Sequence, residues 1–523
     1  MRVTFDAAKL AEALKPHDRS DAPGFAIGVA HRGVPLFRRG YGLANCEAPL
    51  LLTPASRIRI GSTSKHFTVL AVLLLAEEGR LASDDSIRRH LPDMPDWAEP
   101  ITIHHLVTHT SGMRDSLDVM DLTSGVMGRS DAVPHAVQRA LLRRLTSTNF
   151  APGTDWNYCN GGYVLLTELI ERLSGMDYAA FVKERIFDVV GLHDTAARPF
   201  DTDFLPGSAT LHVAQPDGSH RRGIFGPEVG GEGNLVSTVD DMLRWLGAMR
   251  ERRIGTARTW EEMFRSGRVR GSETGYAGGL VTGTWRGLRT LFHTGMVFGG
   301  NSQMLTLPDH ALDVVVLANT SGVSAAETAW KAVEACIEGL EPAPKSAATR
   351  VLRPGCYRSP DTGRFIALVD AGDSVALSFD PVTMPLRIEE DGRAWLPANL
   401  MAGAWIAQAG DALEWHEFGG IDRLEPLAAA ADQSSAAIAG RYRCTEMDAE
   451  AAVDADGKLT ITTDHGKARF GLVRKTSDIW ALVSERDGWT GTLEHRGGTV
   501  LLSTLRTRRL PFRSTAQPSE LPA

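Results

Sequence analysis

The sequence has 523 residues, of which 43% are hydrophobic and 23% charged, and it carries a formal net charge of −8. This length allows two to four domains with large cores, and the composition is that of an ordinary soluble protein. The acidic balance and the absence of any Lys/Arg run argue against a nucleic-acid partner. The longest apolar run ends at Glu77-Glu78, far short of a membrane span, so we expect no membrane partner.

The N-terminus and the cysteines bear on the cellular location. Residues 1–7 are followed by charged, helix-like sequence and show no apolar signal region. The five cysteines are odd in number, widely scattered and without Cys-x-x-Cys spacing, which predicts neither a disulfide framework nor a zinc site. We therefore expect a cytoplasmic protein without a metal or other cofactor. The cysteines are Cys46, Cys159, Cys336, Cys356 and Cys444.

The first 60 residues predict a helix and a hairpin. Residues 1–20 have an amphipathic pattern, with Leu10 and Leu14 on one face. Residues 24–30 and 34–41 have the composition of strands, and the turn between them predicts an antiparallel hairpin.

A serine and a lysine open the next predicted helix. In Gly61-Ser62-Thr63-Ser64-Lys65, Ser62 and Lys65 are three residues apart and so lie on one helical face. Free backbone N–H groups and the helix dipole favour negative charge developing at Ser62. Burial in the apolar helix body would lower the pKa of Lys65 and make it a neutral amine base. Such a pair can activate a serine without a histidine, although Ser-x-x-Lys also occurs by chance at polar helix starts.

Two histidines further along the chain have a spacing that can bind zinc. His105 and His109 are four residues apart, as in zinc sites on a helix. The metalloprotease motif has a Glu directly after its first histidine, whereas this chain has Leu106. We therefore expect a helix packed under an active site rather than a metal centre.

The remainder of the first 340 residues predicts a mixed α/β body. Strands are expected near both ends of this region and helices between them, which indicates one antiparallel sheet built from both ends. A glycine-rich loop at 229–237 lacks the Gly-Lys-Ser/Thr ending of a phosphate loop. The predicted segments are helices within 114–150, 164–173 and 181–195, a loop at 151–163, a helix from 238, strands at 290–295, 301–307 and 311–319, and a helix at 325–340.

The sequence after residue 350 changes to short strands and turns. Gly355-Cys356-Tyr357-Arg358 recurs as Gly440-Arg441-Tyr442-Arg443, and similar strand patterns follow each copy. The repeat predicts two small antiparallel barrels of about eight strands each. Linkers at 341–348 and 427–435 separate the predicted units, which are a first domain at 1–342 and barrel domains at 350–428 and 437–523.

Three motifs follow one another in the first domain: Ser62-Thr63-Ser64-Lys65, Tyr158-Cys159-Asn160 and His293-Thr294-Gly295. In this order and spacing they resemble the serine β-lactamase and penicillin-binding-protein superfamily, and more narrowly its class C-like branch. The two added β-domains narrow the resemblance further, to the bacterial D-aminopeptidases of this superfamily. The resemblance implies an α+β fold, with a class C β-lactamase-like catalytic domain of helices and an antiparallel sheet followed by two small antiparallel β-barrel domains.

The resemblance also implies a role for each motif residue. Ser62 would be the nucleophile and would form an acyl-enzyme. Lys65 and Tyr158 would transfer protons, and the resemblance leaves open which of them takes the serine proton. Asn160 would hold the substrate amide and position Lys65. The backbone N–H groups of Ser62 and Met296 would form the oxyanion hole.

The third motif bears on specificity. Many superfamily members carry Lys where this chain has His293, and a largely neutral histidine attracts a substrate carboxylate less strongly. Thr294 and Gly295 would complete the substrate-binding strand. Some DD-peptidases of the superfamily also contain His-Thr-Gly, so this motif does not distinguish a D-aminopeptidase from a DD-peptidase.

A loop of the last barrel closes the active site in the enzymes that this chain resembles. The matching place in this sequence is residues 463–470, where Asp464 could pair with the ammonium group of a substrate. This segment is shorter and more basic than the family loop, and a solvated turn aspartate is the alternative interpretation of Asp464.

We expect a serine aminopeptidase that releases an N-terminal D-residue such as D-alanine from small peptides, amides or esters. The alternatives are a DD-carboxypeptidase, an esterase or a β-lactamase-like hydrolase, and also a non-catalytic penicillin-binding-like protein. The missing export signal argues against a cell-wall enzyme. The intact Ser62, Lys65 and Tyr158 argue against a pure binding module. The resemblance also implies a homodimer.

Overall fold

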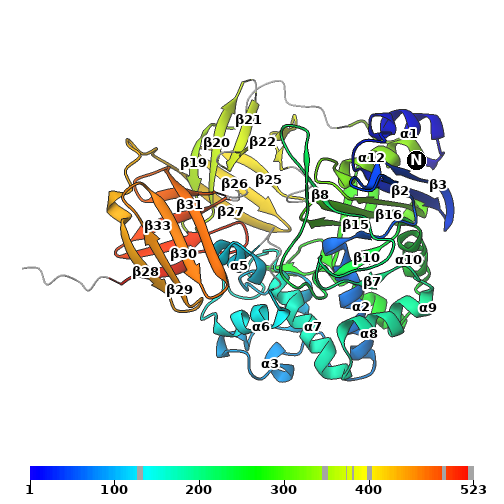
Figure 1. Cartoon of the computed structure of the whole chain (residues 1–523), viewed down its shortest axis with the longest axis horizontal. Coiled ribbons are helices and arrows are strands. Elements are labelled where there is room, and N and C mark those ends of the chain that lie inside the picture. The colour runs from blue at the N-terminus through cyan, green and yellow to red at the C-terminus, as the bar shows by residue number, and fades with distance from the viewer. Residues whose placement is uncertain are drawn as a thin grey trace, which may run out of the picture.

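An antiparallel sheet of seven strands is the centre of the first part of the chain (Figure 1). The computed structural model describes residues 1–126, 133–343, 351–372, 374–379, 382–396, 403–485 and 490–515. The pairing of β17 with β2 joins the two ends of the first part, which confirms the sheet expected from the sequence. In spatial order the strands are β13 (Tyr276–Ala277), β14 (Leu280–Trp285), β15 (Leu288–Val297), β16 (Gly300–Leu307), β17 (Leu312–Ala318), β2 (Phe25–His31) and β3 (Val34–Tyr41).

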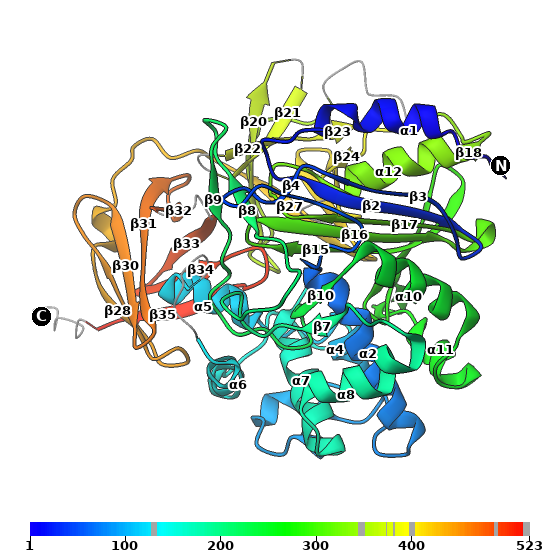
Figure 2. The same ribbon diagram turned by 45° about the vertical axis from the view of Figure 1, so that its right-hand side comes forward.

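Helices cover both faces of this sheet (Figure 2). Every residue of β17 is buried, and its side chains alternate between two hydrophobic clusters. Val314 and Val316 belong to the cluster with α1 (Ala7–Leu14) and α12 (Ala325–Cys336). Val315 and Leu317 belong to the larger cluster on the other face, with α10 (Val239–Glu251) and α2 (Lys65–Glu77). The strand is therefore hydrophobic except at Asp313, because both of its faces are covered.

The helix α2 is buried along most of its length. Residues 65–75 are all buried, so the unbroken apolar run marks a central helix rather than a surface one. The preceding turn, Gly61–Ser64, is a 3-10 helix (η2) and not the first turn of an α-helix. The helices around α2 and further along the chain are α4 (Ile103–Val107), α5 (Ser116–Ser124), α6 (His135–Arg144), α7 (Asn160–Ser174), α8 (Tyr178–Val182), a π-helical turn (Lys183–Phe187), α9 (Asp188–Val190) and α11 (Ala257–Met263).

Several predicted boundaries differ from the structure. The helix expected over 1–20 is limited to α1, because a 3-10 turn that contains Pro16 follows it at Lys15–His17. The helix expected at 164–173 already begins at Asn160. The remaining short elements of the first part are β1 (Arg2–Val3), β4 (Leu43–Asn45), β5 (Leu50–Leu51), β6 (Ile58–Arg59), α3 (Ile87–His90), η3 (Asp96–Ala98), β7 (Ala196–Ala197), β8 (His212–Ala214), β9 (His220–Arg222), β10 (Leu235–Ser237), β11 (Arg268–Val269), β12 (Ser272–Glu273), η5 (Pro308–His310) and β18 (Ile337–Glu338).

The next unit is a nine-stranded antiparallel sheet that nearly closes on itself. Its two edge strands, β22 and β23, are separated only by Leu386, so the ends of the sheet meet although no ladder joins them. The strands are β19 (Gly355–Arg358), β20 (Phe365–Ala371), β21 (Ser374–Phe379), β22 (Val382–Pro385), β23 (Arg387–Ile388), β24 (Ala394–Trp395), β25 (Trp405–Ala409), β26 (Ala412–Glu417) and β27 (Gly420–Leu427).

The last unit is a closed antiparallel barrel of eight strands. It contacts the first part of the chain through α5, which packs against β30 and β31 (Figure 1). The strands are β28 (Gly440–Cys444), β29 (Ala449–Val453), β30 (Lys458–Thr463), β31 (Gly466–Arg474), β32 (Ile479–Ser484), β33 (Thr490–Arg496), β34 (Thr499–Ser503) and β35 (Leu510–Ser514). The expected pair of barrels is therefore present, one closed and one nearly closed.

The repeated Gly-x-Tyr has the same structural role in both units. Gly355 and Gly440 begin their strands with φ of 152° and 153°, a conformation that favours glycine. Two residues later, the hydroxyl of Tyr357 donates to the carbonyl of Arg353, 2.9 Å away. The hydroxyl of Tyr442 donates to the carbonyl of Ile438, 2.8 Å away. The motif thus fixes the entry of the chain into each sheet.

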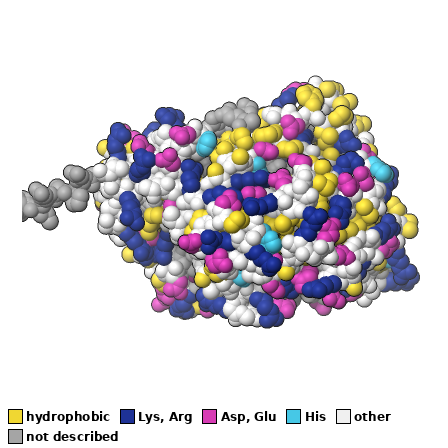
Figure 3. Space-filling model, turned by 90° about the horizontal axis from the view of Figure 1, so that it is seen from below, with side chains coloured by type: hydrophobic (Ala, Val, Ile, Leu, Met, Phe, Trp, Pro, Cys, Tyr) yellow, Lys and Arg dark blue, Asp and Glu magenta, His cyan; other side chains and the backbone are white. Residues whose placement is uncertain are grey.

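One face of the molecule carries mixed charge. On the face seen in Figure 3, Lys and Arg side chains are interspersed with Asp and Glu side chains. No helix in the described ranges is long and apolar enough to cross a membrane. Residues 344–350, which include part of the first predicted linker, lie outside the described residues, as do 127–132 of the region predicted to be largely helical.

Strand β15 lies directly against the chain that precedes η2, and Gly295 is the point of closest approach. A Cβ atom at Gly295 would lie 1.8 Å from the carbonyl oxygen of Ile60 and 2.5 Å from Ser302 Oγ. These distances are far below van der Waals contact, so β15 reaches this position only because residue 295 has no side chain.

We predict that Gly295→Ala lowers the free energy of unfolding by about 1–3 kcal/mol, because β15 and Ile60 must separate to accept the methyl group. Gly283→Ala on the neighbouring strand β14 is the matched control, since its added Cβ would meet nothing closer than 3.6 Å. Urea denaturation of both variants tests this prediction. Equal stability of the two alanine variants would contradict it.

Candidate active site

Ser62 lies in a tightly fixed turn at the base of α2. Its neighbour Ser64 donates through Oγ to the carbonyl of Gly61, 2.7 Å away, and Thr63 Oγ1 lies 2.9 Å from Ser302 Oγ. Thr63 and Ser64 are buried, whereas Ser62 is partly exposed. The turn therefore holds Ser62 still while leaving its hydroxyl accessible.

The amine of Lys65 is fully buried and meets three acceptors. Nζ donates to Ser62 Oγ at 3.2 Å, to Asn160 Oδ1 at 2.8 Å and to the backbone carbonyl of Glu232 at 2.6 Å. Burial lowers the pKa of Lys65 to about 7, and the positive charge of Arg506 acts in the same direction. The carboxylates of Glu232 and Asp115 oppose this shift. Near neutral pH the amine is therefore close to its midpoint and can accept a proton.

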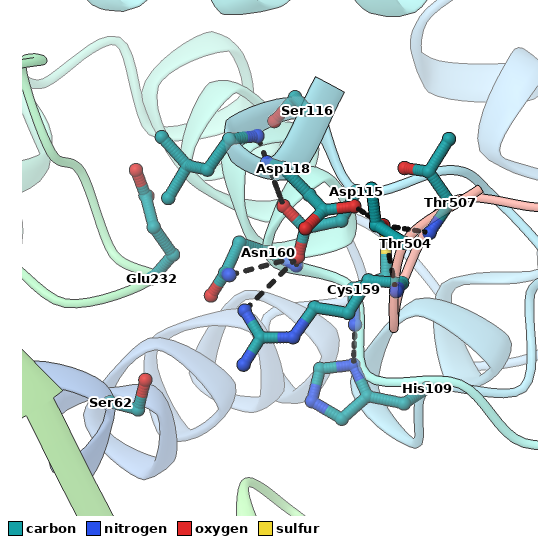
Figure 4. Close-up of polar contacts among 12 residues, drawn as sticks. Ser62, His109, Asp115, Ser116, Asp118, Cys159, Asn160, Glu232, Thr504 and Thr507 are labelled. Atoms are coloured by element: carbon teal, nitrogen blue, oxygen red, sulfur yellow. Dashed lines mark hydrogen bonds and ion pairs between the residues drawn. The ribbon is translucent and has the colours of Figure 1, made fainter. Parts of the chain in front are cut away.

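Asp115 orients the second motif. Its Oδ2 accepts from the backbone N–H of Asn160 at 2.7 Å and from Nδ2 of the same residue at 2.9 Å (Figure 4). Its Oδ1 accepts from the backbone N–H groups of Leu117 and Asp118 at the start of α5. Because Nδ2 of Asn160 is held by Asp115, Oδ1 of Asn160 must face Lys65.

Tyr158 lies against Lys65 and His109. Nζ of Lys65 is 4.9 Å from the centroid of the Tyr158 ring, and the His109 ring centroid is 4.2 Å from it. Burial raises the pKa of Tyr158 well above its usual value, although the guanidinium of Arg506 and the hydroxyl of Ser62 both favour the phenolate. Tyr158 is therefore a neutral phenol across the physiological range and can donate a proton.

His293 is held neutral inside a chain of buried hydrogen bonds. Its Nδ1 lies 2.7 Å from the carbonyl of Thr294, which can only accept, so Nδ1 carries the proton. Nε2 of His293 therefore accepts from the hydroxyl of Tyr276 at 2.9 Å. Burial lowers the pKa of His293 to about 3, and the charge of Lys65 adds to this effect. Both ring nitrogens are occupied, so His293 presents no positive charge to a substrate.

The chain of hydrogen bonds continues to His109. Its Nδ1 accepts from the backbone N–H of Cys159 at 3.2 Å, so its Nε2 carries the proton and donates to the hydroxyl of Tyr276 at 3.2 Å. Burial lowers the pKa of His109 well below its usual value. The network thus fixes the tautomers of two neutral histidines and connects the second motif to the third.

Both C-terminal β-units contribute side chains to this region. Phe418, in the turn between β26 and β27, packs against Trp156 in a tilted arrangement with ring centroids 4.1 Å apart. From the closed barrel, the segment between β34 and β35 places Arg506 over Tyr158, with 4.7 Å from Cζ to the ring centroid. Arg506 also forms an ion pair with Asp115 at 3.8 Å.

Two further residues predicted to bind substrate, Thr294 and Met296, lie on strand β15. Thr294 donates through Oγ1 to Gln303 Oε1 at 2.6 Å, which turns its hydroxyl toward β16. The side chain of Met296 is exposed. Its backbone lies beside η2, since a Cβ on Gly61 would meet the Met296 carbonyl oxygen at 2.9 Å and its nitrogen at 3.0 Å.

The structure places Asp464 away from the contacts described above. It lies in the exposed turn between β30 and β31, whose neighbour Thr463 meets Ser124 of α5 at 2.6 Å. Among the described residues, no hydrogen bond or ion pair joins Asp464 to Ser62, Lys65 or Tyr158. The segment of the barrel that contacts Tyr158 is instead the one that carries Arg506, because the hairpin of β30 and β31 packs on α5.

The described part of the chain also contains no cluster of three or more His, Cys, Asp or Glu side chains suited to a metal ion. Of the two histidines considered for zinc, His109 belongs to the network above. His105 accepts through Nδ1 from the backbone N–H of Thr102 at 3.2 Å, where it caps α4.

The family described as Beta-lactamase matches residues 10–337. The chain belongs to the beta-lactamase family. This match spans the seven-stranded sheet and all three motifs, while the two β-units lie beyond it.

Curated relatives of this beta-lactamase family member extend over nearly the whole chain. A protein of Brucella canis named D-aminopeptidase is 26% identical over 487 residues, which cover 89% of this chain and 88% of the relative. A D-aminopeptidase of Brucella anthropi is 26% identical over 492 residues, with the same shares of each chain.

Solved structures share the fold. The octameric penicillin-binding protein homologue from Pyrococcus abyssi has a TM-score of 0.57 at 20% identity, covering 97% of this chain and 100% of its own. The D-amino acid amidase from Ochrobactrum anthropi has a TM-score of 0.51 at 21% identity, covering 62% of this chain and 97% of its own. The longer of these two matches extends over the C-terminal β-units as well.

Sequence patterns did not identify several of the residues that the structure places at the site. Asp115 could have been noticed as a helix N-cap, but its contact with Asn160 spans 45 residues. The carbonyl of Glu232 comes from the glycine-rich loop, whose composition excluded a phosphate site without indicating another role. Tyr276, Phe418 and Arg506 lie outside any motif, so only the fold brings them to the site.

We predict that Tyr276→Phe leaves a donor on His109 and an acceptor on His293 without partners, while the backbone of Thr294 and Cys159 still holds both Nδ1 atoms. The variant should lose about 1–3 kcal/mol of unfolding free energy. The ¹⁵N shift of His293 Nε2 should move downfield, as expected for an imidazole nitrogen that loses its hydrogen-bond donor, while Nδ1 keeps its proton.

Tyr178→Phe is the matched control, since it removes a buried hydroxyl bonded to Thr68 at 2.8 Å, outside the histidine network. It should leave the imidazole shifts unchanged. Unaltered His293 shifts in Tyr276→Phe would contradict the proposed chain of hydrogen bonds.

Proposed function

We propose that the chain is a D-stereospecific serine hydrolase that releases N-terminal D-amino acids from small peptides, amides or esters. The observation that carries the catalytic part is the amine of Lys65, buried 3.2 Å from Ser62 Oγ with its pKa lowered to about 7. The names of the curated relatives, D-aminopeptidase, support the choice of substrate. The fold shared with a D-amino acid amidase agrees with this choice.

In the proposed acylation step, the neutral amine of Lys65 takes the proton of Ser62 as Oγ attacks the substrate carbonyl. Tyr158 gives its phenolic proton to the leaving amine as the C–N bond breaks. The Lys65 ammonium then returns a proton to Tyr158, so both groups regain their starting states. In deacylation, water takes the place of the leaving amine: it attacks the acyl carbonyl, and the same proton transfers run in reverse and free Ser62. The raised pKa of Tyr158 favours this assignment, because a neutral phenol serves as the acid and Lys65 as the base.

The developing oxyanion would be bound by the backbone N–H groups of Ser62 and Met296. Support comes from the close approach of β15 to η2, where Gly61 and Gly295 let the two backbones lie side by side. Asn160 would bind the substrate amide through the Nδ2 hydrogen that does not face Asp115. Thr294 and Gly295 would line the strand edge beside the substrate.

The neutral His293 fits an aminopeptidase, while the choice over the alternative DD-carboxypeptidase is supported by the names of the curated relatives. A carboxypeptidase must bind the terminal carboxylate of its substrate, and a cation at the third motif would serve that purpose. In this chain the pKa of His293 is lowered to about 3 and both ring nitrogens are occupied. An esterase or β-lactamase-like hydrolase would use the same acylation machinery and differ only in the leaving group.

Location, assembly and domain limits remain part of the proposal. We keep the cytoplasmic location and the homodimer inferred from the sequence, while one structural relative is described as octameric. The proposed domains are 1–342, 350–428 and 437–523. The transitions between the three sheets, after β18 and after β27, support these limits.

The test compares hydrolysis of D-Ala-p-nitroanilide, L-Ala-p-nitroanilide and an acyl-D-Ala-D-Ala peptide. We predict preference for the D-anilide, and a fall in kcat/KM of about a thousandfold or more in Ser62→Ala. Ser272→Ala, at an exposed serine of β12, should retain full activity. Turnover confined to the acylated peptide would overturn the aminopeptidase assignment, and undiminished activity in Ser62→Ala would overturn the mechanism.

A further inference from the structure

We propose that Arg506 binds a carboxylate of the substrate, so that the enzyme prefers substrates with an acidic group next to the scissile bond. This inference rests on the proposed function and adds a charge preference to it. The observation behind it is a partly exposed guanidinium that the last barrel holds over Tyr158.

The guanidinium of Arg506 has N–H donors that are available to a ligand. An arginine side chain carries five N–H donors. Among the described residues, no hydrogen bond comes from the guanidinium of Arg506, and its ion pair with Asp115 is long, at 3.8 Å. Both oxygens of Asp115 already accept from Asn160, Leu117 and Asp118. With its side chain 39% exposed, Arg506 can reach a ligand without leaving its place.

The segment that carries Arg506 is anchored on both sides by other residues. On one side, Thr504 Oγ1 forms a hydrogen bond with Asp118 and accepts from the backbone N–H of Thr507 at 2.9 Å (Figure 4). On the other side, the guanidinium of Arg508 donates to Asp155 at 2.8 Å. Asn149 Nδ2 also donates to the backbone carbonyl of Arg506 at 2.9 Å. The guanidinium of Arg506 is therefore not needed to hold the segment.

The charges around the site favour an anion. Arg506 contributes a positive charge, Lys65 contributes one only when it is protonated, and His293 is neutral. The nearby acids are already engaged: Asp115 as above, and Glu232 in an ion pair with His135 at 3.3 Å. Burial and the neighbouring Asp115 raise the pKa of Asp118 to about 7, which reduces its negative charge. A carboxylate can form two parallel hydrogen bonds with a guanidinium, which fits this environment.

Two sources could supply the carboxylate, namely the side chain of the released D-residue or the α-carboxylate of the leaving residue. The test measures kcat/KM for two isosteric pairs. D-Glu-p-nitroanilide against D-Gln-p-nitroanilide tests the first source. D-Ala-Gly against D-Ala-glycinamide tests the second.

We expect the wild type to prefer the charged member of one pair by about tenfold to a hundredfold. Arg506→Gln should abolish that preference, and Arg506→Lys should keep part of it, because a lysine retains the charge without the planar fork. Arg513→Gln removes an exposed arginine from β35 of the same barrel and should leave the ratio unchanged. The ratio is internal to each variant, so partial loss of folded protein does not affect it.

Absence of a charge preference in both pairs, or a preference that survives in Arg506→Gln, would overturn the inference. The proposed function is judged separately, by hydrolysis of the neutral members above the Ser62→Ala background. If no member is hydrolysed, calorimetric binding of D-glutamate and D-glutamine to the wild type and to Arg506→Gln decides the matter. Equal affinities for D-glutamate in the two proteins would then refute the role of Arg506.

Discussion

The site depends on the burial of one amine. Lys65 is removed from water, which lowers the pKa of its ammonium toward neutrality, yet Ser62 Oγ, Asn160 Oδ1 and the carbonyl of Glu232 satisfy its hydrogen bonds. These acceptors come from η2, from the start of α7 and from the glycine-rich loop before β10. Three distant parts of the chain must therefore fold correctly before Lys65 can act as the base that we propose for Ser62.

The C-terminal units contribute packing and charge around the amine of Lys65, but no group that transfers a proton in the proposed mechanism. Phe418 packs under the aromatic side chains around Tyr158, and Arg506 adds positive charge that lowers the pKa of both Lys65 and Tyr158. The residues proposed for acylation lie in the part of the chain that matches the beta-lactamase family. Substrate choice, in this account, is set by a residue from the last barrel.

The sequence predicted those features that depend on local pattern. The hairpin of β2 and β3, the continuation of the sheet at β15–β17 and the repeated Gly-x-Tyr are all encoded within a few residues. Asp115, Tyr276 and Arg506 could not be predicted, because their roles come from contacts with residues far away in the chain. The 463–470 segment was chosen by its place in the barrel, whereas packing on α5 directs a different hairpin to Tyr158. The apolar periodicity also did not predict that α2 begins only after a 3-10 turn, η2, because the two helix types differ little in their sequence patterns.

The central claim is that Lys65 is close to half neutral at physiological pH. Carbon-13 NMR of protein labelled at lysine Cε measures this directly, with the Lys65 signal assigned by its absence from Lys65→Met. The account predicts a titration midpoint near pH 7 for Lys65, far below the ordinary lysine value of about 10.4. A Lys65 signal that stays fully protonated up to pH 9 would contradict it.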